Sequence, residues 1–218
     1  MTTPDLSRHP LAGLKVLDLG QIYNGPYAGF LLAMGGAEVV KIEPLTGEAI
    51  RARGGSRGAS FAMAMLNSNK HGIALNLKSD EGKVVFRDLA KQADLVLENF
   101  APGVMDRLGL GADSLQADNP RLIYASSTGY GLSGPSSNGL AMDLTIQAAS
   151  GVMSINGPAD GPPLKTGLAI CDFYGGIHLY AGIMTALYER SVSGVGRKVE
   201  ISMQEATYPA LATNLTRM

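Results

Sequence analysis

The sequence has little of what several classes of protein require. Cys171 is the only cysteine among 218 residues, which excludes a disulfide framework and a cysteine-based zinc site. The 18 Lys and Arg residues are offset by 19 Asp and Glu residues, so no basic face for nucleic acid is expected. No run of about 18 apolar residues is present to span a membrane, and the polar start from Met1 to Pro10 lacks the core of a signal peptide. We expect a soluble, cytoplasmic protein that binds neither nucleic acid nor a membrane.

The three histidines and the cysteine do not form a recognisable site. His9, His71 and His178 are far apart in the sequence, no H-E-x-x-H motif is present, and we expect no metal. Cys171 has no histidine near it in the sequence and follows the apolar Ile170. This setting favours a buried, unreactive thiol over a nucleophile.

Two glycine patterns match known motifs but have the wrong context. Residues 129–134 match the dinucleotide-binding pattern G-x-G-x-x-G, yet Pro135 follows where the phosphate-binding helix has to begin. Residues 54–58 match the hydrolase pattern G-x-S-x-G, which needs a strand before it and a helix after it. We expect a long polar loop over residues 44–60, and therefore neither function.

Short apolar runs alternate with segments of helical periodicity, which is typical of an α/β protein. We expect strands over residues 15–19, 38–42, 73–77, 94–98, 121–125 and 198–201. We expect helices over residues 27–34, 79–92, 143–151 and 173–190, and around Leu115. In the helix over 79–92, the side chains expected to face inward are Val84, Val85, Leu89 and Ala90. The pattern predicts a Rossmann-like, doubly wound, mostly parallel sheet of about six strands, with the ligand beyond the carboxyl ends of the strands.

Asp172 is the strongest candidate for a reactive group. It interrupts an apolar run at the start of the longest helical segment, where it is equally able to act as a helix N-cap. Gly175 and Gly176 follow in the first turns, at a cost of about 1 kcal/mol each relative to alanine. Such glycines are useful where a ligand or another backbone approaches closely. We therefore expect a carboxylate beside an open surface without Cβ atoms.

Six segments of the sequence together resemble a known family. They are L-D-L-G-Q-I-Y-N-G-P (17–26), G-A-E-V-V-K-I-E (36–43), N-S-N-K (67–70), E-N-F-A-P-G (98–103), D-F-Y-G-G-I-H-L (172–179) and G-V-G-R-K-V-E-I-S-M-Q (194–204). In this order they resemble the class III CoA-transferases, the family of formyl-CoA:oxalate and crotonobetainyl-CoA:carnitine CoA-transferases. The resemblance covers residues 10–215.

The resemblance implies an intertwined homodimer whose larger domain is Rossmann-like. It implies transfer of CoA from an acyl-CoA donor to a small carboxylic acid, with coenzyme A and acyl-CoA as substrates and no metal. Asp172 would be the nucleophile, forming first a mixed anhydride with the acyl group and then an aspartyl-CoA thioester. The N-terminus of its helix would keep Asp172 ionised.

The resemblance also implies roles for residues outside the helix of Asp172. Asp143 and Gln21 would belong to the catalytic site, although Asp143 also suits a helix N-terminus and Gln21 a turn. The implied contacts to CoA are Leu75, Lys78, Asn99, Phe100, Ala101 and Arg107. Lys78 and Arg107 are equally consistent with solvated surface charges. An arginine that some members carry after Lys-Ile-Glu is replaced by Pro44, and Arg51 or Arg53 is a candidate substitute.

Family members are considerably longer than this chain. We expect a flexible N-terminus over residues 1–10, a CoA-binding and catalytic domain over 11–206, and the start of a linker to an absent small domain over 207–218. A fragment, a proteolysed product or half of a split enzyme would fit, and we expect the chain alone to be inactive.

Two alternatives to CoA transfer remain open. One is an acyl-CoA racemase or isomerase of the same fold, which pairs its aspartate with a histidine just before the position of Asp143. This sequence has Ala141 and Met142 there, so that base is missing. The other alternative is a truncated CoA-binding module without activity.

Overall fold

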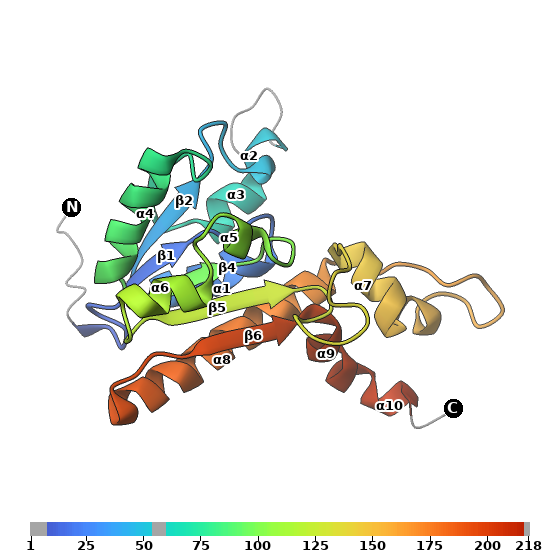
Figure 1. Ribbon diagram of the computed structural model, residues 1–218. Helices are drawn as coiled ribbons and strands as arrows, with labels where there is room; N and C mark the ends of the chain where they lie inside the picture. Colours follow the sequence, from blue (N-terminus) through green and yellow to red (C-terminus); the bar gives the residue numbers. More distant parts are fainter. Residues whose placement is uncertain (1–7, 54–59, 216–218) are drawn as a thin grey trace.

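A computed structural model describes residues 8–53 and 60–215 (Figure 1). Its centre is a six-stranded sheet in the order β3-β2-β1-β4-β5-β6. The strands are β1 (Lys15–Asp18), β2 (Glu38–Glu43), β3 (His71–Ala74), β4 (Leu95–Glu98), β5 (Ile123–Thr128) and β6 (Lys198–Ser202). All neighbouring strands are parallel. The strand order reverses between β1 and β4, so the prediction of a doubly wound sheet is confirmed.

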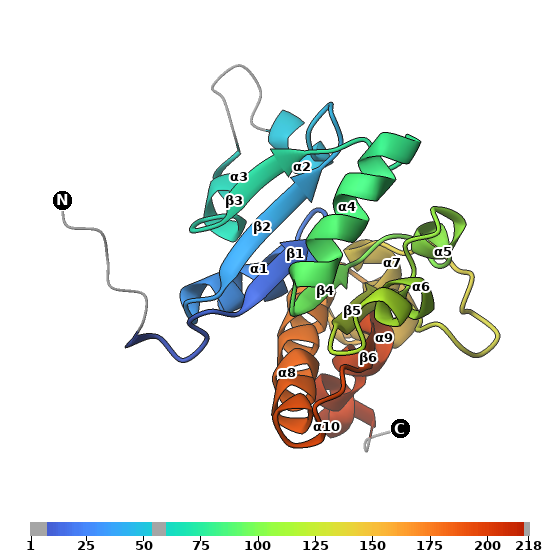
Figure 2. The ribbon, with the colours of Figure 1, turned by 60° about the vertical axis from the view of Figure 1, so that its left-hand side comes forward.

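Helices cover both faces of the sheet (Figures 1 and 2). They are α1 (Asn24–Met34), α2 (Ala49–Ala52), α3 (Phe61–Leu66), α4 (Asp80–Gln92), α5 (Val104–Arg107), α6 (Ala112–Asp118), α7 (Asp143–Ser150), α8 (Ile170–Ser193), α9 (Met203–Thr207) and α10 (Ala212–Leu215). Single turns of 3-10 helix lie at Val152–Ile155 and Tyr208–Leu211. None of the helices in the described part of the chain is long and apolar enough to cross a membrane.

Alternate residues of the strands pack on opposite faces of the sheet. Val16, Leu95 and Leu97 join the cluster under α1 and α8, whereas Leu17 and Val96 join the cluster under α4 and α6. Burial on both faces explains why these strands are continuous apolar runs rather than alternating ones.

The structure corrects the expected loop over residues 44–60. Residues Ala49–Ala52 form the short helix α2, in which Ile50 is buried. The G-x-S-x-G match at 54–58 lies outside the described residues. The expected strand over 73–77 is instead His71–Ala74, because its pairing with β2 begins where His71 aligns with Val40.

The inward face of α4 also differs from the expectation. Val84 and Val85 are 58% and 43% exposed, whereas Phe86 is fully buried. The buried residues of this helix are Gly82, Phe86 and Ala90, which recur every fourth position and so lie on one side. Two adjacent valines cannot both belong to that side.

The glycines after Asp172 allow α8 to approach α1. A Cβ added to Gly176 would lie 2.7 Å from the backbone oxygen of Asn24, and one added to Gly175 would lie 2.1 Å from Asn24 Nδ2. Both glycines are buried. The expected open surface beside Asp172 is therefore wrong, and these glycines serve the packing of two helices.

Candidate active site

Two loops meet beyond the carboxyl ends of β1 and β4, where the strand order reverses. The backbone N–H of Gln21 donates to Asn99 Oδ1 over 2.6 Å, and Asn99 Nδ2 donates to the backbone oxygen of Gln21 over 3.0 Å. This reciprocal pair fixes the loop after β1 against the loop after β4. The crevice at such a reversal is the usual ligand site of a doubly wound sheet.

Asp172 lines a cavity of about 220 Å³ at this reversal of the strand order. Its side chain comes from the first turn of α8, and the residue is 9% exposed. Gln21, Asn99, Phe100 and Ala101 line the same cavity. The remaining lining residues are Ile22, Pro102, Ser127, Thr128, Gly129, Gly139, Leu140, Ala141, Met142 and Met203. The structure thus places one buried carboxylate in a cavity that is lined by both polar and apolar groups.

Asp143 contacts the first turn of α8. Its Oδ1 accepts hydrogen bonds from the backbone N–H groups of Cys171 at 2.8 Å and Asp172 at 3.1 Å. Its Oδ2 accepts from Gln147 Nε2 at 2.6 Å. Ala169 is the N-cap residue of α8 and has no capping side chain. Asp143 therefore supplies the cap from another helix, and Asp172 does not act as the cap.

Burial raises the pKa of Asp172 from 3.8 to about 7, and the neighbouring charge of Asp143 raises it as well. The positive charge of Arg53 acts in the opposite direction. With a pKa of about 7 the carboxyl group is only partly ionised near neutral pH, so burial counteracts the expected preference for the ionised form. The N–H groups of Cys171 and Asp172 in the first turn already donate to the carboxylate of Asp143, and desolvation is the largest cause of the raised pKa of Asp172.

A second cavity, of about 410 Å³, lies beside the first. Gln21 and Phe100 line both cavities, so the two adjoin at the carboxyl edge of the sheet, and they are called the groove below. Leu75 and Lys78 line the second cavity, together with Leu19, Gly20, Ile42, Glu43, Pro44, Leu45, Thr46, Glu48, Asn76, Leu77, Val104 and Leu108. Arg107 is exposed on α5 and lies outside the described linings of both cavities.

A family model described as CoA-transferase family III matches residues 11–218. The chain belongs to this family. It is 41% identical over 209 residues to an acetyl-CoA:oxalate CoA-transferase of Acetobacter aceti, covering 94% of this chain and 54% of that protein. It is 43% identical over 198 residues to a formyl-CoA:oxalate CoA-transferase of Streptomyces avermitilis, covering 90% of this chain and 48% of that protein. The chain spans about half the length of the curated relatives it matches.

Solved structures show the same family fold. A CAIB/BAIF family protein from Brucella suis matches with a TM-score of 0.91 and 33% identity, over 96% of this chain and 57% of that one. The protein Rv3272 of Mycobacterium tuberculosis matches with a TM-score of 0.90 and 34% identity, over 96% of this chain and 59% of that one. The identification as the N-terminal part of a CoA-transferase family III protein is thereby confirmed.

The two arginines considered as substitutes in this family III chain lie in different settings. Arg51 donates two hydrogen bonds of 2.5 Å to Glu43, so its charge is already paired. Arg53 is exposed and its charge acts on Asp172. Of the two, Arg53 is the one whose field reaches the buried carboxylate.

Cys171 is buried, as predicted, and burial raises the pKa of its thiol to about 11. A thiol with such a pKa is a poor nucleophile near neutral pH. Within the described residues, no cluster of three or more His, Cys, Asp or Glu side chains is arranged to hold a metal ion.

Sequence reasoning missed several buried charges next to the groove. Lys41, Glu48 and Lys70 have side chains that are 3%, 1% and 1% exposed. The available signal was Lys41, a charged residue inside the apolar run of β2. Charged residues are rarely fully buried unless they are paired.

Proposed function

We propose that this chain forms the CoA-binding and nucleophile-bearing domain of an enzyme that transfers CoA from an acyl-CoA to a carboxylic acid. The observation that carries the proposal is the buried carboxylate of Asp172 in the groove at the strand reversal. The names of the curated relatives, which are acetyl-CoA:oxalate and formyl-CoA:oxalate CoA-transferases, support this reaction class.

The proposed first half-reaction uses Asp172 twice. A carboxylate oxygen attacks the thioester carbon of the donor, the C–S bond breaks, and a mixed anhydride and CoA thiolate form. The thiolate then attacks the Asp172 carbonyl carbon, which releases the donor acid and leaves an aspartyl-CoA thioester. The acceptor carboxylate repeats these steps in reverse order, giving the acceptor acyl-CoA and free Asp172.

The surroundings of Asp172 suit this relay. Desolvation raises the pKa of the carboxyl group to about 7, so the carboxylate is poorly solvated and its attack requires little loss of water. Gln21 lines the same cavity, and its side-chain amide is proposed to donate to the oxygen that becomes negative during attack. Asp143 is proposed to orient the first turn of α8 through its two hydrogen bonds to backbone N–H groups.

We propose that CoA occupies the joined groove. Leu75 and Lys78 would contact its adenosine phosphate end, and Asn99, Phe100 and Ala101 would contact the arm that carries the thioester. Arg107, exposed on α5, would reach a phosphate only at the rim. We also propose the intertwined homodimer, with residues 11–206 as the CoA domain and 207–218 leading to a further domain.

Trapping of the acyl-enzyme tests the nucleophile. The natural full-length protein is incubated with an acyl-CoA donor and then with hydroxylamine, which converts both the anhydride and the thioester to a hydroxamate. Mass spectrometry is expected to find the modification on Asp172, and the Asp172→Ala variant is expected to bind CoA but to lose transfer by more than tenfold, or about 1.4 kcal/mol. Modification of Cys171, or transfer retained in the variant, would contradict the assignment.

The racemase alternative makes a different prediction. A racemase exchanges the α-proton of a branched acyl-CoA with solvent deuterium, which needs a base in addition to Asp172. Among the described lining residues of the Asp172 cavity there is no histidine, and Ala141 and Met142 stand before Asp143. We therefore expect transfer without α-proton exchange. A screen of acyl-CoA donors against carboxylic acids, read by mass spectrometry in deuterated water, measures both reactions.

A further inference from the structure

The loop after β1 contains a strained residue beside the groove. Ile22 has a φ of +64°, a left-handed conformation that is unusual for a β-branched side chain. Such conformations cost about 1–3 kcal/mol and persist only where surrounding contacts impose them. Gln21, which lines both cavities, immediately precedes it.

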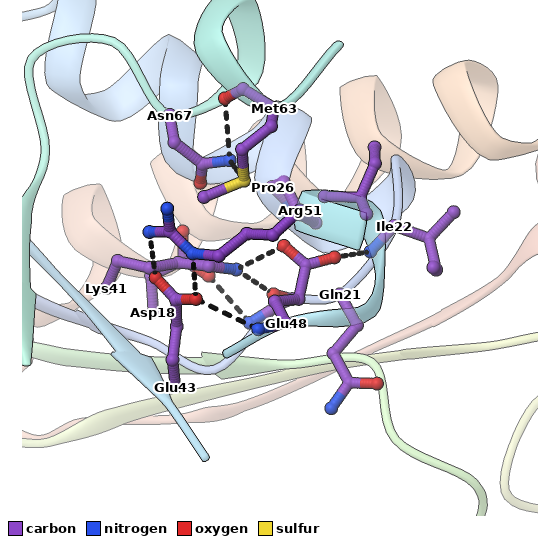
Figure 3. Close-up of polar contacts among 12 residues, drawn as sticks. Asp18, Gln21, Ile22, Pro26, Lys41, Glu43, Glu48, Arg51, Met63 and Asn67 are labelled. Carbon is purple, nitrogen blue, oxygen red and sulfur yellow. Dashed lines mark hydrogen bonds and ion pairs between the residues drawn. The ribbon is translucent and has the colours of Figure 1, made fainter. Parts of the chain in front are cut away.

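Four side chains bind the backbone of this loop, and one of them is Asn99, which holds Gln21 as described above. Asp18 Oδ1 accepts from the N–H of Gly20 over 2.7 Å, and Lys41 Nζ donates to the oxygen of Gly20. Glu48 Oε1 accepts from the N–H of Ile22 over 2.7 Å. In Figure 3 the carboxylate of Glu48 faces the backbone of Ile22, while the side chain of Gln21 extends away from the cluster.

The charges that bind the loop form a buried network. Lys41 Nζ lies 3.5 Å from Glu48 Oε2, with side chains 3% and 1% exposed. Lys70 Nζ lies 2.7 Å from Asp18 Oδ2, with side chains 1% and 0% exposed. Buried ion pairs are weak contributors to stability because desolvation offsets their attraction. This network is therefore better explained by the geometry that it imposes than by the stability that it adds.

Glu48 connects the strained turn to the next strand. Its backbone N–H donates to Glu43 Oε2 over 2.9 Å, and Glu43 is in turn paired with Arg51. Among the described residues, Glu48 Oε1 is the one acceptor of a hydrogen bond from the N–H of Ile22. Removal of Glu48 would take away the hydrogen bond at the N–H of Ile22 that helps to impose its left-handed conformation.

We propose that Glu48 is a positioning residue of the transfer site. It holds the left-handed turn at Ile22 and thereby keeps the side-chain amide of Gln21 at the junction of the two cavities. The inference rests on the proposed function for its kinetic consequence, and on the hydrogen bond between Glu48 and Ile22 for its structural one. Displacement of a catalytic amide by about 1 Å is enough to lower turnover by as much as 100-fold.

Two variants at Glu48 separate position from stability in the natural full-length protein. Glu48→Ala removes both the charge and the acceptor, whereas Glu48→Gln removes the charge but keeps an oxygen for the N–H of Ile22. Both leave Lys41 buried without its anion and are expected to lower the unfolding midpoint. Only Glu48→Ala is expected to lower kcat strongly, by about 10- to 100-fold, with KM for the donor changed less than about threefold.

Hydrogen exchange gives a readout that does not depend on activity. Exchange of a peptide covering residues 20–23 is expected to become about tenfold faster in Glu48→Ala and to stay near the wild-type rate in Glu48→Gln. Arg190→Met serves as the control, because it breaks a partly buried ion pair of 3.0 Å with Asp94 at the amino edge of the sheet. This control is expected to lower stability without changing exchange at 20–23 or kcat.

A double-mutant cycle tests whether Glu48 acts through Gln21. In a Gln21→Ala background, Glu48→Ala is expected to lower kcat by less than about twofold further. If Glu48→Ala does not fold, the double variant Lys41→Met/Glu48→Leu replaces the pair by apolar side chains and serves in both measurements.

The outcomes are distinguishable. Faster exchange together with a kinetic loss that depends on Gln21 supports the proposal. Unchanged exchange in Glu48→Ala overturns it, as does an equal kinetic loss with and without Gln21, or a kcat that follows stability in Glu48→Gln. If the wild-type protein transfers no CoA with any donor, the proposed function fails, and the exchange rates still decide whether Glu48 holds the turn.

Discussion

Asp172 and Asp143 differ in solvation although both are carboxylates of the same site. Asp143 accepts three hydrogen bonds, whereas burial and the charge of Asp143 raise the pKa of Asp172 to about 7. Two acidic groups in unlike environments can take different roles in one site. The raised pKa has consequences for both stability and activity.

Asp172→Asn is expected to stabilise the protein at neutral and alkaline pH. The folded protein holds the proton up to about pH 7, whereas the unfolded chain releases it near 3.8, so stability falls as pH rises between these values and stays low above them. The neutral amide removes that loss and should raise the free energy of unfolding by about 1–3 kcal/mol at about pH 8. Urea unfolding from about pH 4.5 to 8 measures it, and an equal gain at the acidic end would point to packing instead.

Asp143→Asn is expected to move the acid limb of the transfer rate to lower pH. Removing the charge of Asp143 lowers the pKa of Asp172, so the reactive carboxylate persists at more acidic pH. The asparagine keeps an oxygen for the N–H groups of Cys171 and Asp172 but loses the acceptor for Gln147 Nε2. Arg53→Gln is the matched variant, since it should move the same limb to higher pH. A pH–rate profile that is unaltered in both would contradict this electrostatic account.

At the scale of elements, α1 and α8 pack tightly against each other beside the site. Gly175 and Gly176 let the backbone of α8 approach Asn24, and Tyr27 packs edge-on against Phe173 with ring centroids 4.9 Å apart. The position of Asp172 at the cavity therefore depends on a contact between two helices that are distant in sequence.

Gly176→Ala is expected to destabilise the protein by about 1–3 kcal/mol, although alanine is the better helix former. The added Cβ would lie 2.7 Å from a backbone oxygen, which cannot move aside as a side chain can. Gly72→Ala is the control, because a Cβ there meets nothing within 4 Å. Thermal unfolding of the two variants gives the comparison, and equal midpoints would show that α1 and α8 can separate at little cost.

At the scale of the whole molecule, large apolar side chains remain exposed on one long helix and around α7. On α8, Tyr188 and Val192 are 75% and 77% exposed and Ile177 is 43% exposed. Near α7, Leu140 is 75% and Met142 59% exposed. Scattered apolar residues are normal on a surface, but contiguous patches promote association.

The isolated 218-residue chain is therefore expected to self-associate. Sedimentation velocity over a range of concentrations should show species larger than the monomer, and a hydrophobic dye should bind. The double variant Tyr188→Ser/Val192→Ser should shift the distribution toward monomer, whereas Val84→Ser, on the exposed side of α4, should not. A compact monomer at all concentrations, without dye binding, would be evidence against the proposed homodimer.

Local patterns predicted most of the fold. The short runs of β1, β4 and β5 are buried on both faces of the sheet, and this burial leaves a local signature. The local pattern was not enough for α4. It places Val84 and Val85 inward, but the side of α4 that packs on the sheet carries Phe86.

The sequence predicts which residues belong to the candidate site better than it predicts how they are arranged. Asp172, Gln21, Asn99, Phe100 and Ala101 were named together from motifs, and the structure places them around one cavity. Their catalytic and binding roles remain predictions. Arg107 was named with the same CoA contacts and lies outside the described linings. A motif indicates which residues occur together in a family, but it gives no distances between their side chains.

The sequence by itself determined the α/β class, the order of the strands along the chain, and the family. These follow from periodicity and from motifs within a few residues of each other, where the chain itself sets the separation. Only the tertiary structure decided that Asp143 caps α8 beside Asp172, that Gly176 faces Asn24, and that Glu48 holds Ile22. Each of these contacts joins residues more than twenty positions apart, and their energies depend on burial and distance, which exist only once the chain has folded.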